Sequence, residues 1–244
     1  MLPEQIIAMG GGGFSMEPEN LALDRYVLSH ARAADPKVCF VPTASGDSEN
    51  YIRRFYDSFT SLPCRPRHLS LFNLPTRDLR SYLCECDVIY VGGGNTRLLL
   101  LIWQELGVPD LLRQAVREGT ILAGVSAGAN CWFDASVTDS MGSVQDAWDG
   151  RLGAVAGFGF LSGSFCPHYD GEKHRRPEYH RLIQEGALPS GWAADDGCAL
   201  HFVDRILEKV VTSRPPAAAF RVELRDGAVA ETPREPRLLE PVRA

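Results

Sequence analysis

A serine at position 126 stands in a pattern that nucleophilic hydrolases use. Residues 121–130 read ILAGVSAGAN, so Ser126 is the centre of G-x-S-x-G between an apolar run and a segment of small residues. Such a serine lies on a tight strand-to-helix turn that exposes its hydroxyl above the sheet. The amide of Ala127 would then point at an oxyanion formed by attack from Ser126. A glycine-lined turn capped by serine gives the same pattern, so the motif needs support from elsewhere in the chain.

A second glycine loop, Gly92 to Gly94 followed by Asn95 and Thr96, comes directly after another short apolar run. The carboxyl ends of parallel strands share one edge of a sheet, so this loop would lie at the same edge as Ser126. Bare amides of this loop could supply the second donor of an oxyanion hole. Neither this loop nor Gly10 to Gly13 continues into a nucleotide-binding glycine motif, which makes a nucleotide site the weaker interpretation.

A serine hydroxyl needs a base, and His168 is the favoured one of six histidines. It follows Phe165-Cys166-Pro167, where an apolar run ends at a proline and a turn presents the imidazole. No spacing rule fixes this choice. The other five are expected to be structural or solvated, namely His30, His68, His174, His180 and His201.

The acid that would orient the base is harder to choose. Asp139 is the first candidate, because it begins a loop between the serine and His168. The remaining candidates are Asp134, Asp146 and Asp149 in the same interval, and Asp195 and Asp196 in a second cluster. Each of these aspartates is, taken singly, also typical of a turn or a helix cap.

The first 130 residues alternate short apolar runs with amphipathic segments. The runs predict strands at Gln5–Met9, Lys37–Val41, Arg67–Leu71, Asp87–Val91 and Ile121–Val125. Helical periodicity occurs at 19–33, around 52–59, at 96–106 and at 109–118. This alternation predicts an α/β fold with a doubly wound, mostly parallel sheet and helices on both of its faces.

Beyond residue 150 the pattern changes to short β-like runs around one helix near Pro177 to Glu185. These runs are Phe158–Leu161, Ala199–Val203, Ile206–Val211 and Ala217–Leu224. We expect them to complete the same sheet and to add antiparallel edge strands near the C-terminus. The chain is therefore predicted to be a single α/β domain, residues 1–244, with a frayed tail over 232–244 that carries three prolines and mixed charge.

Composition excludes several classes of protein. Apolar residues make up 45% and charged residues 23%, which is typical of a globular chain with a sizeable core. The longest apolar run, Leu98 to Trp103, is too short for a membrane span. A net charge of -6 argues against nucleic acid or an anionic membrane as partner.

Cysteine usage and the start of the chain predict a reducing compartment. Seven cysteines are too few for a disulfide scaffold, and residues 1–5 have no signal segment, so a cytoplasmic location is expected. Cys84-x-Cys86 and Cys166-x-His168 have the wrong spacing for zinc. Neither a metal nor another cofactor is expected.

These motifs together resemble the dipeptidase E and cyanophycinase group of serine peptidases, which is related in fold to class I glutamine amidotransferases. The resemblance covers residues 5 to 212 and rests on VGGGNT at 91–96, GVSAGAN at 124–130 and CPHY at 166–169. It implies Ser126 as nucleophile, His168 as base, and an oxyanion hole made of the amides of Gly93 or Gly94 with Ala127.

The resemblance also implies roles for other residues. The family's acid lies a little over a dozen residues after the serine, which indicates Asp139. Asn95 and Thr96 are assigned to substrate binding with their loop. Family members that cleave after an N-terminal aspartate hold its carboxylate with an arginine beyond the histidine, and Arg176 is the candidate counterpart.

The sequence thus predicts a serine hydrolase that cleaves a small peptide or isopeptide through an acyl-enzyme on Ser126. It is expected to be dipeptidase-like, with N-terminal aspartate as a candidate specificity. Two alternatives stay open. One is an esterase of the α/β-hydrolase type, and the other is a non-catalytic module that binds a small ligand at the sheet edge. The expected partner is the peptide substrate, and a homodimer is compatible with an enzyme of this size.

Overall fold

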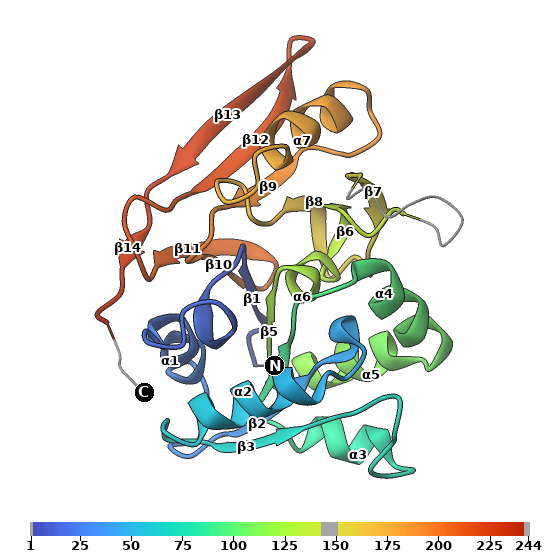
Figure 1. The fold of residues 1–244 in the computed structure, drawn as a ribbon, viewed down its shortest axis with the longest axis vertical. Helices are drawn as coiled ribbons and strands as arrows, with labels where there is room; N and C mark the ends of the chain where they lie inside the picture. Colours follow the sequence, from blue (N-terminus) through green and yellow to red (C-terminus); the bar gives the residue numbers. More distant parts are fainter. Residues whose placement is uncertain (1, 143–150, 242–244) are drawn as a thin grey trace.

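The computed structural model describes residues 2–142 and 151–241 as two β-sheets with helices packed around them (Figure 1). The larger sheet has eight strands in the order β14-β11-β10-β1-β5-β4-β2-β3, and the smaller has six in the order β13-β12-β9-β8-β6-β7. The fold is the predicted mixed α/β class.

The centre of the larger sheet is parallel, as predicted. It consists of β1 (Gln5–Met9), β2 (Lys37–Val41), β3 (Arg65–His68), β4 (Val88–Val91) and β5 (Ile121–Val125). β10 (Cys198–Val203) pairs antiparallel with β1, and β11 (Ile206–Thr212) pairs antiparallel with β10. The third strand lies two residues earlier than the sequence predicted, because Leu69 and Leu71 leave the sheet and enter the core beneath it.

Helices cover both faces of the larger sheet because its strands are apolar on both sides. α1 (Ala22–Leu28) and α2 (Glu49–Phe59) pack on one face with Ile7, Phe40 and Tyr90. The opposite face holds α3 (Leu79–Cys84), α4 (Thr96–Glu105) and α5 (Val108–Arg117), which pack with Ile89 and Leu122. The short helix α6 (Ala127–Asn130) begins at the carboxyl end of β5.

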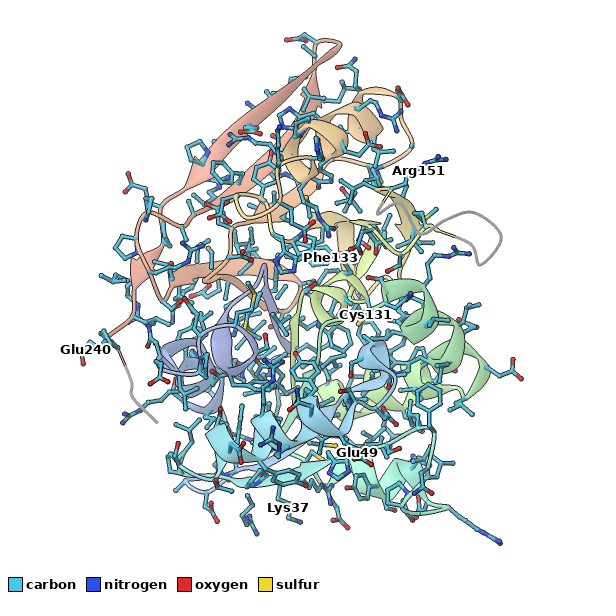
Figure 2. The ribbon with its side chains drawn as sticks, in the orientation of Figure 1. Lys37, Glu49, Cys131, Phe133, Arg151 and Glu240 are labelled. Atoms are coloured by element: carbon cyan, nitrogen blue, oxygen red, sulfur yellow. The ribbon has the colours of Figure 1, made fainter. Side chains whose placement is uncertain are left out.

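The later part of the chain builds a second sheet. Its strands are β6 (Phe133–Thr138), β7 (Gly153–Ala156), β8 (Leu161–Cys166), β9 (Gly191–Ala194), β12 (Ala219–Arg225) and β13 (Ala228–Arg234), with α7 (Arg175–Gln184) packed against it. Cys131 and Phe133 lie in the core that the two sheets share (Figure 2). The expectation that these runs complete one sheet was therefore wrong. The β10–β11 hairpin occupies the β1 side of the first sheet, so the other strands pair among themselves.

Two further expectations are corrected. Of the expected strand at 158–161, residues 158–160 form a loop, and only Leu161 belongs to a strand, as the first residue of β8. The segment expected to fray is held by pairing up to residue 239: β13 pairs with β12, β14 (Arg237–Leu238) pairs with β11, and the amide of Leu239 donates to the carbonyl of Thr212 (2.8 Å). Among the helices of the described residues, none is both long and apolar enough to cross a membrane.

Candidate active site

Ser126 occupies a strained turn between β5 and α6. Its backbone has φ 55° and ψ −115°, a region that non-glycine residues rarely adopt and that is common at functional sites. The flanking glycines permit the turn, since a Cβ at Gly124 would lie 2.1 Å from the carbonyl oxygen of Gly128, and one at Gly128 would lie 2.2 Å from that of Val91. The structure thus explains G-x-S-x-G as a close approach of three backbone segments.

Ser126, His168 and Asp196 form a hydrogen-bonded chain. The hydroxyl oxygen of Ser126 lies 2.9 Å from Nε2 of His168, and Nδ1 of His168 lies 2.6 Å from a carboxylate oxygen of Asp196. A carboxylate only accepts hydrogen bonds, so we assign the imidazole proton to Nδ1. Nε2 is then free to accept the proton of Ser126, which is the arrangement that a general base requires.

The loop that follows β8 delivers the imidazole. Pro167 ends the strand, and His168 adopts a left-handed backbone (φ 52°). The amide of His168 donates to the carbonyl of Gly10 (3.3 Å), and the amide of Tyr169 donates to that of Ala194 (3.2 Å). The position of the base therefore depends on the ends of β1 and β9, which are distant in sequence.

Asp196, rather than Asp139, contacts the imidazole, and this corrects the first choice of acid. Asp196 lies between β9 and β10, and its amide donates to the side chain of Asp170 (2.8 Å). Asp139 is half-exposed and lies 4.0 Å from the guanidinium of Arg175. The spacing from the serine predicted a residue after β6, but that loop packs against α7 instead of His168.

The remaining candidate acids have other partners or lie outside the described residues. A carboxylate oxygen of Asp134 accepts from the amide of Gly163 (2.9 Å), and one of Asp195 accepts from the amide of Ala218 (2.8 Å). Burial raises the pKa of Asp195 to about 6. Asp146 and Asp149 fall in the segment 143–150 that the structure does not describe.

The first glycine cluster makes room for the acid and the base. A Cβ at Gly11 would lie 2.0 Å from a carboxylate oxygen of Asp196 and 3.0 Å from Cε1 of His168. A Cβ at Gly10 would lie 2.3 Å from the carbonyl oxygen of Ala194. The sequence showed this cluster only as the end of a strand. Its position at the carboxyl end of β1, beside β5, was the signal that could have assigned it to the site.

A buried carboxyl, that of Asp24, holds the segment that directly follows the first glycine cluster. Asp24 is fully buried in α1, and its two oxygens accept from the amide of Phe14 (2.8 Å) and the hydroxyl of Tyr90 (3.0 Å). Burial raises the pKa of Asp24 to about 7. Sequence reasoning missed this residue, because most aspartates in helices lie on the surface and nothing in the local sequence marks Asp24 as buried.

The second glycine loop lies against the serine. A Cβ built on Gly93 would be 3.3 Å from the Cβ of Ser126. The amide of Gly93 donates to the hydroxyl of Tyr51 (3.3 Å), a residue that sequence reasoning missed. In the part of the chain that the structure describes, the amides of Gly94 and Ala127 have no hydrogen-bond partner. These two amides are available to an incoming oxyanion, while Gly93 would have to release Tyr51.

Asn95 and Thr96, expected to bind substrate, both make hydrogen bonds within the chain. The side chain of Asn95 caps α4 by accepting from the amide of Leu98 (2.9 Å). Thr96 is buried, and its hydroxyl accepts from the side-chain amide of Asn130 (3.2 Å). This bond ties the glycine loop before α4 to the helix that follows Ser126.

Arg176 is neutralised by a neighbouring carboxylate. Its guanidinium donates to both oxygens of Glu231 and lies over the rings of Tyr169 and Phe220. Burial alone would raise the pKa of Glu231, but hydrogen bonds from Arg176 and Tyr169 hold it below its ordinary value. His180, expected to be solvated, also contacts Glu231 (2.5 Å). Arg176 is therefore not a free cation in this structure.

Comparison with known proteins finds similarity to peptidases. The model of peptidase family S51 matches residues 6–210. An uncharacterized peptidase, YgaJ, from Bacillus subtilis (strain 168) is 56% identical over 94% of this chain and 96% of its own length. Peptidase E from Actinobacillus pleuropneumoniae serotype 5b (strain L20) is 29% identical over 68% of this chain and 70% of its own. The crystal structure of a peptidase from an acI-B1 Actinobacterium has a similar fold, with a TM-score of 0.67, 17% identity, and coverage of 100% of this chain and 98% of that one.

Proposed function

This chain belongs to peptidase family S51, and from that premise we propose that it is a serine peptidase that forms an acyl-enzyme on Ser126. The observation that carries the proposal is the continuous chain of contacts from the hydroxyl of Ser126 through His168 to Asp196. Nucleophile, base and orienting acid are within hydrogen-bond distance of one another, which is the geometric requirement for this chemistry.

In the acylation step, the oxygen of Ser126 attacks the scissile carbonyl carbon and its proton passes to Nε2 of His168. The carboxylate of Asp196 stabilises the imidazolium that forms. The negative charge on the carbonyl oxygen is taken up by the amide of Ala127 and an amide of the Gly93–Gly94 loop. The carbon–nitrogen bond then breaks, and His168 returns the proton to the leaving amine.

Deacylation repeats the sequence with water. His168 removes a proton from water, the hydroxide oxygen attacks the acyl carbon, and the bond to Ser126 breaks. The proton on the imidazole returns to the serine oxygen, and the free acid leaves. The residues that the chain supplies complete both steps.

We propose a small peptide or an isopeptide as substrate. The expected preference for N-terminal aspartate depended on Arg176, whose charge Glu231 already neutralises. We therefore expect peptides that begin with Asp to be cleaved no faster than the matched peptides that begin with Asn. A dipeptide panel varying only the first residue measures this, and a preference for Asp above about tenfold would show that another cation holds the carboxylate.

Labelling by a fluorophosphonate tests the proposed mechanism. Wild-type protein should be labelled at Ser126, and the Ser126→Ala variant should lose both labelling and about 10⁴-fold or more of its peptidase activity. A thermal melt of the variant serves as the control for folding. Failure of the wild type to label or to turn over any peptide would favour the non-catalytic binding module. Faster turnover of simple esters than of peptides would favour the esterase alternative.

We also propose a cytoplasmic location. All seven cysteines are free thiols, and five of them are buried. Free thiols persist in a reducing compartment. Fractionation of cells that express the chain from its natural gene is the direct measurement, and recovery outside the cytoplasm would refute the proposal.

A further inference from the structure

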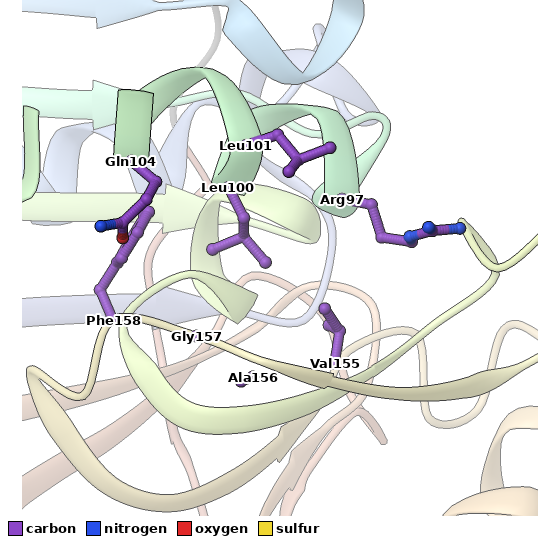
Figure 3. A pocket seen from close by; sticks show the side chains of 8 residues that line it. All are labelled: Arg97, Leu100, Leu101, Gln104, Val155, Ala156, Gly157 and Phe158. Atoms are coloured by element: carbon purple, nitrogen blue, oxygen red, sulfur yellow. The ribbon is translucent and has the colours of Figure 1, made fainter. Parts of the chain in front are cut away.

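A groove lies beside α4, away from the contacts that hold the imidazole. It has a volume of about 360 Å³, within the range of roughly 300–1,000 Å³ that ligand pockets occupy. One wall is α4, and the other is the end of β7 together with the segment that follows it (Figure 3). Its lining residues are Arg97, Leu100, Leu101, Gln104, Val155, Ala156, Gly157 and Phe158. We call this the α4 groove.

The walls of the α4 groove are apolar and fixed in place. Leu101 is 63% exposed, although it is a large apolar residue on a helix, so apolar surface is left open to solvent. The opposite wall is held by Phe158, whose ring stacks on Trp103 with a centroid distance of 6.0 Å. The carbonyl of Phe158 also accepts from the guanidinium of Arg113. These contacts hold both the ring and the backbone of Phe158 in place.

One end of the α4 groove carries the positive charge of Arg97. Its guanidinium donates to the carbonyls of Ser140 (3.3 Å) and Met141 (3.4 Å), which orient it without cancelling its charge. No carboxylate among residues 2–142 and 151–241 forms an ion pair with Arg97. The first turn of α4 contains no acidic residue either, whereas the first turns of α2, α5 and α7 each contain one. The helix dipole adds to the local positive potential.

Arg97, at one end of the α4 groove, shortly follows the glycine loop that lies against Ser126. Gly93, which lies against Ser126, is four residues before Arg97, so their Cα atoms are at most about 14 Å apart. An extended peptide covers about 3.3 Å with each residue, and two or three residues beyond a scissile bond therefore span much of this distance. A peptide with at least two or three residues beyond the scissile bond would be long enough to extend from Ser126 toward Arg97.

From the charge and the apolar walls, we infer that the α4 groove binds the C-terminal residue of a peptide. An apolar side chain packs between Leu101 and Phe158, and the terminal carboxylate pairs with Arg97. An apolar slot with a cation at its end is complementary to both parts of such a residue. The inference deepens the proposed peptidase function and rests on it for the effect on turnover, but binding itself can be measured separately.

The binding test uses the full-length Ser126→Ala protein, so that no probe is cleaved. The probes are Gly-Gly-Phe, its C-terminal amide and Gly-Gly-Gly, measured by calorimetry. Gly-Gly-Phe should bind about tenfold more tightly than its amide, because the amide lacks the charge that pairs with Arg97. It should also bind about tenfold more tightly than Gly-Gly-Gly, because burial of the ring is lost in the latter. Equal affinity for all three peptides would overturn the inference.

Substitutions then localise the binding. Arg97→Gln should abolish the preference for the carboxylate over the amide, and Arg97→Lys should keep most of it. Leu101→Glu should weaken binding of Gly-Gly-Phe about tenfold or more. Leu98→Glu is the matched control, because Leu98 is 53% exposed on the same helix but does not line the groove. Equal effects at Leu98 and Leu101, or an unchanged preference in Arg97→Gln, would refute the assignment.

Two further measurements separate this inference from its alternatives. Sedimentation of the wild type and Leu101→Glu reports whether the groove is instead covered by a second copy of this chain. A dimer that only Leu101→Glu dissociates, without peptide binding, would overturn the inference. If Ser126 fails to label with fluorophosphonate while peptide binding follows the predicted variant pattern, the groove assignment stands and the peptidase mechanism fails. If labelling is normal and no carboxylate preference is found, the mechanism stands and the groove assignment fails.

Discussion

Two regions of the molecule meet at Ser126, and they are built in different ways. The carboxyl edge of the parallel strands supplies Ser126, the proposed nucleophile, and the backbone amides of the proposed oxyanion hole, from loops that directly follow β4 and β5. The connections after β8 and β9 supply His168 and Asp196 from a second sheet and its junction with the first. The first region is specified by short local motifs. The second depends on how the two sheets pack, and so its residues carry no recognisable spacing.

The largest expected effect tests the second region. Asp196→Asn should lower kcat by about 10⁴-fold for two reasons. The amide can hold the imidazole in the wrong tautomer, and it carries no negative charge to stabilise the imidazolium. Asp139→Asn should change kcat by less than about threefold, since its pair with Arg175 is long and half-exposed. The comparison is made on the best peptide from the substrate panel, with thermal melts as the control for folding. A larger loss of kcat in Asp139→Asn than in Asp196→Asn would identify Asp139 as the orienting acid.

The next effect tests how the two regions touch. Gly11→Ala should lower kcat by tens to about a hundredfold with little change in KM, because the added Cβ would displace the carboxylate of Asp196. Gly107→Ala is the control for a glycine substitution away from the site: Gly107 has a positive φ (66°), which disfavours a side chain, but it has no neighbour within 4 Å of the added atom. The control should lose stability without losing rate. Equal rates in both variants would contradict a role for the first glycine cluster at the site.

A third effect concerns stability within the first region. Burial raises the pKa of Asp24 to about 7 in the folded chain, so the proton is bound more tightly there than in the unfolded chain. Stability from this group is greatest below the ordinary pKa near 4 and is lost as the pH rises through about 7. Asp24→Asn removes the titration.

The measurement for Asp24 is urea unfolding at pH 5 and pH 8. The loss of unfolding free energy between these pH values should be about 2–3 kcal/mol smaller in Asp24→Asn than in the wild type. The other titrating groups are shared and cancel in the difference. An equal loss in both proteins would mean that the carboxyl of Asp24 is ionised throughout this range.

The smallest effect concerns the link between the two local motifs. Thr96→Val removes the hydroxyl that accepts from Asn130, so a buried amide loses a partner. The free energy of unfolding should fall by about 1–2 kcal/mol. Thr60→Val, at an exposed hydroxyl that bonds within its own helix end, should change it by less than about 0.5 kcal/mol. Equal losses of unfolding free energy in the two variants would show that the hydrogen bond between Thr96 and Asn130 contributes no more to stability than the exposed one at Thr60.

The sequence alone predicted the α/β class, the five parallel strands and the strand-to-helix turn at Ser126. Those features follow from local periodicity and from glycines that a tight turn requires, both of which a linear pattern records. His168 came from the same kind of evidence, since a proline ends an apolar strand directly before it. By contrast, the motif did not show that Asn95 caps α4 or that Thr96 is buried against Asn130, because a linear motif does not say which contacts its side chains make.

Only the tertiary structure placed Asp196, one of six candidate acids, against His168, separated the second sheet from the first, and paired Arg176 with Glu231. Each of these outcomes depends on contacts between segments that are 28 to 55 residues apart or that belong to different sheets. A carboxylate has the same composition and local context whether it caps a turn or orients an imidazole. What distinguishes the two is the three-dimensional neighbourhood, which packing of the whole chain creates.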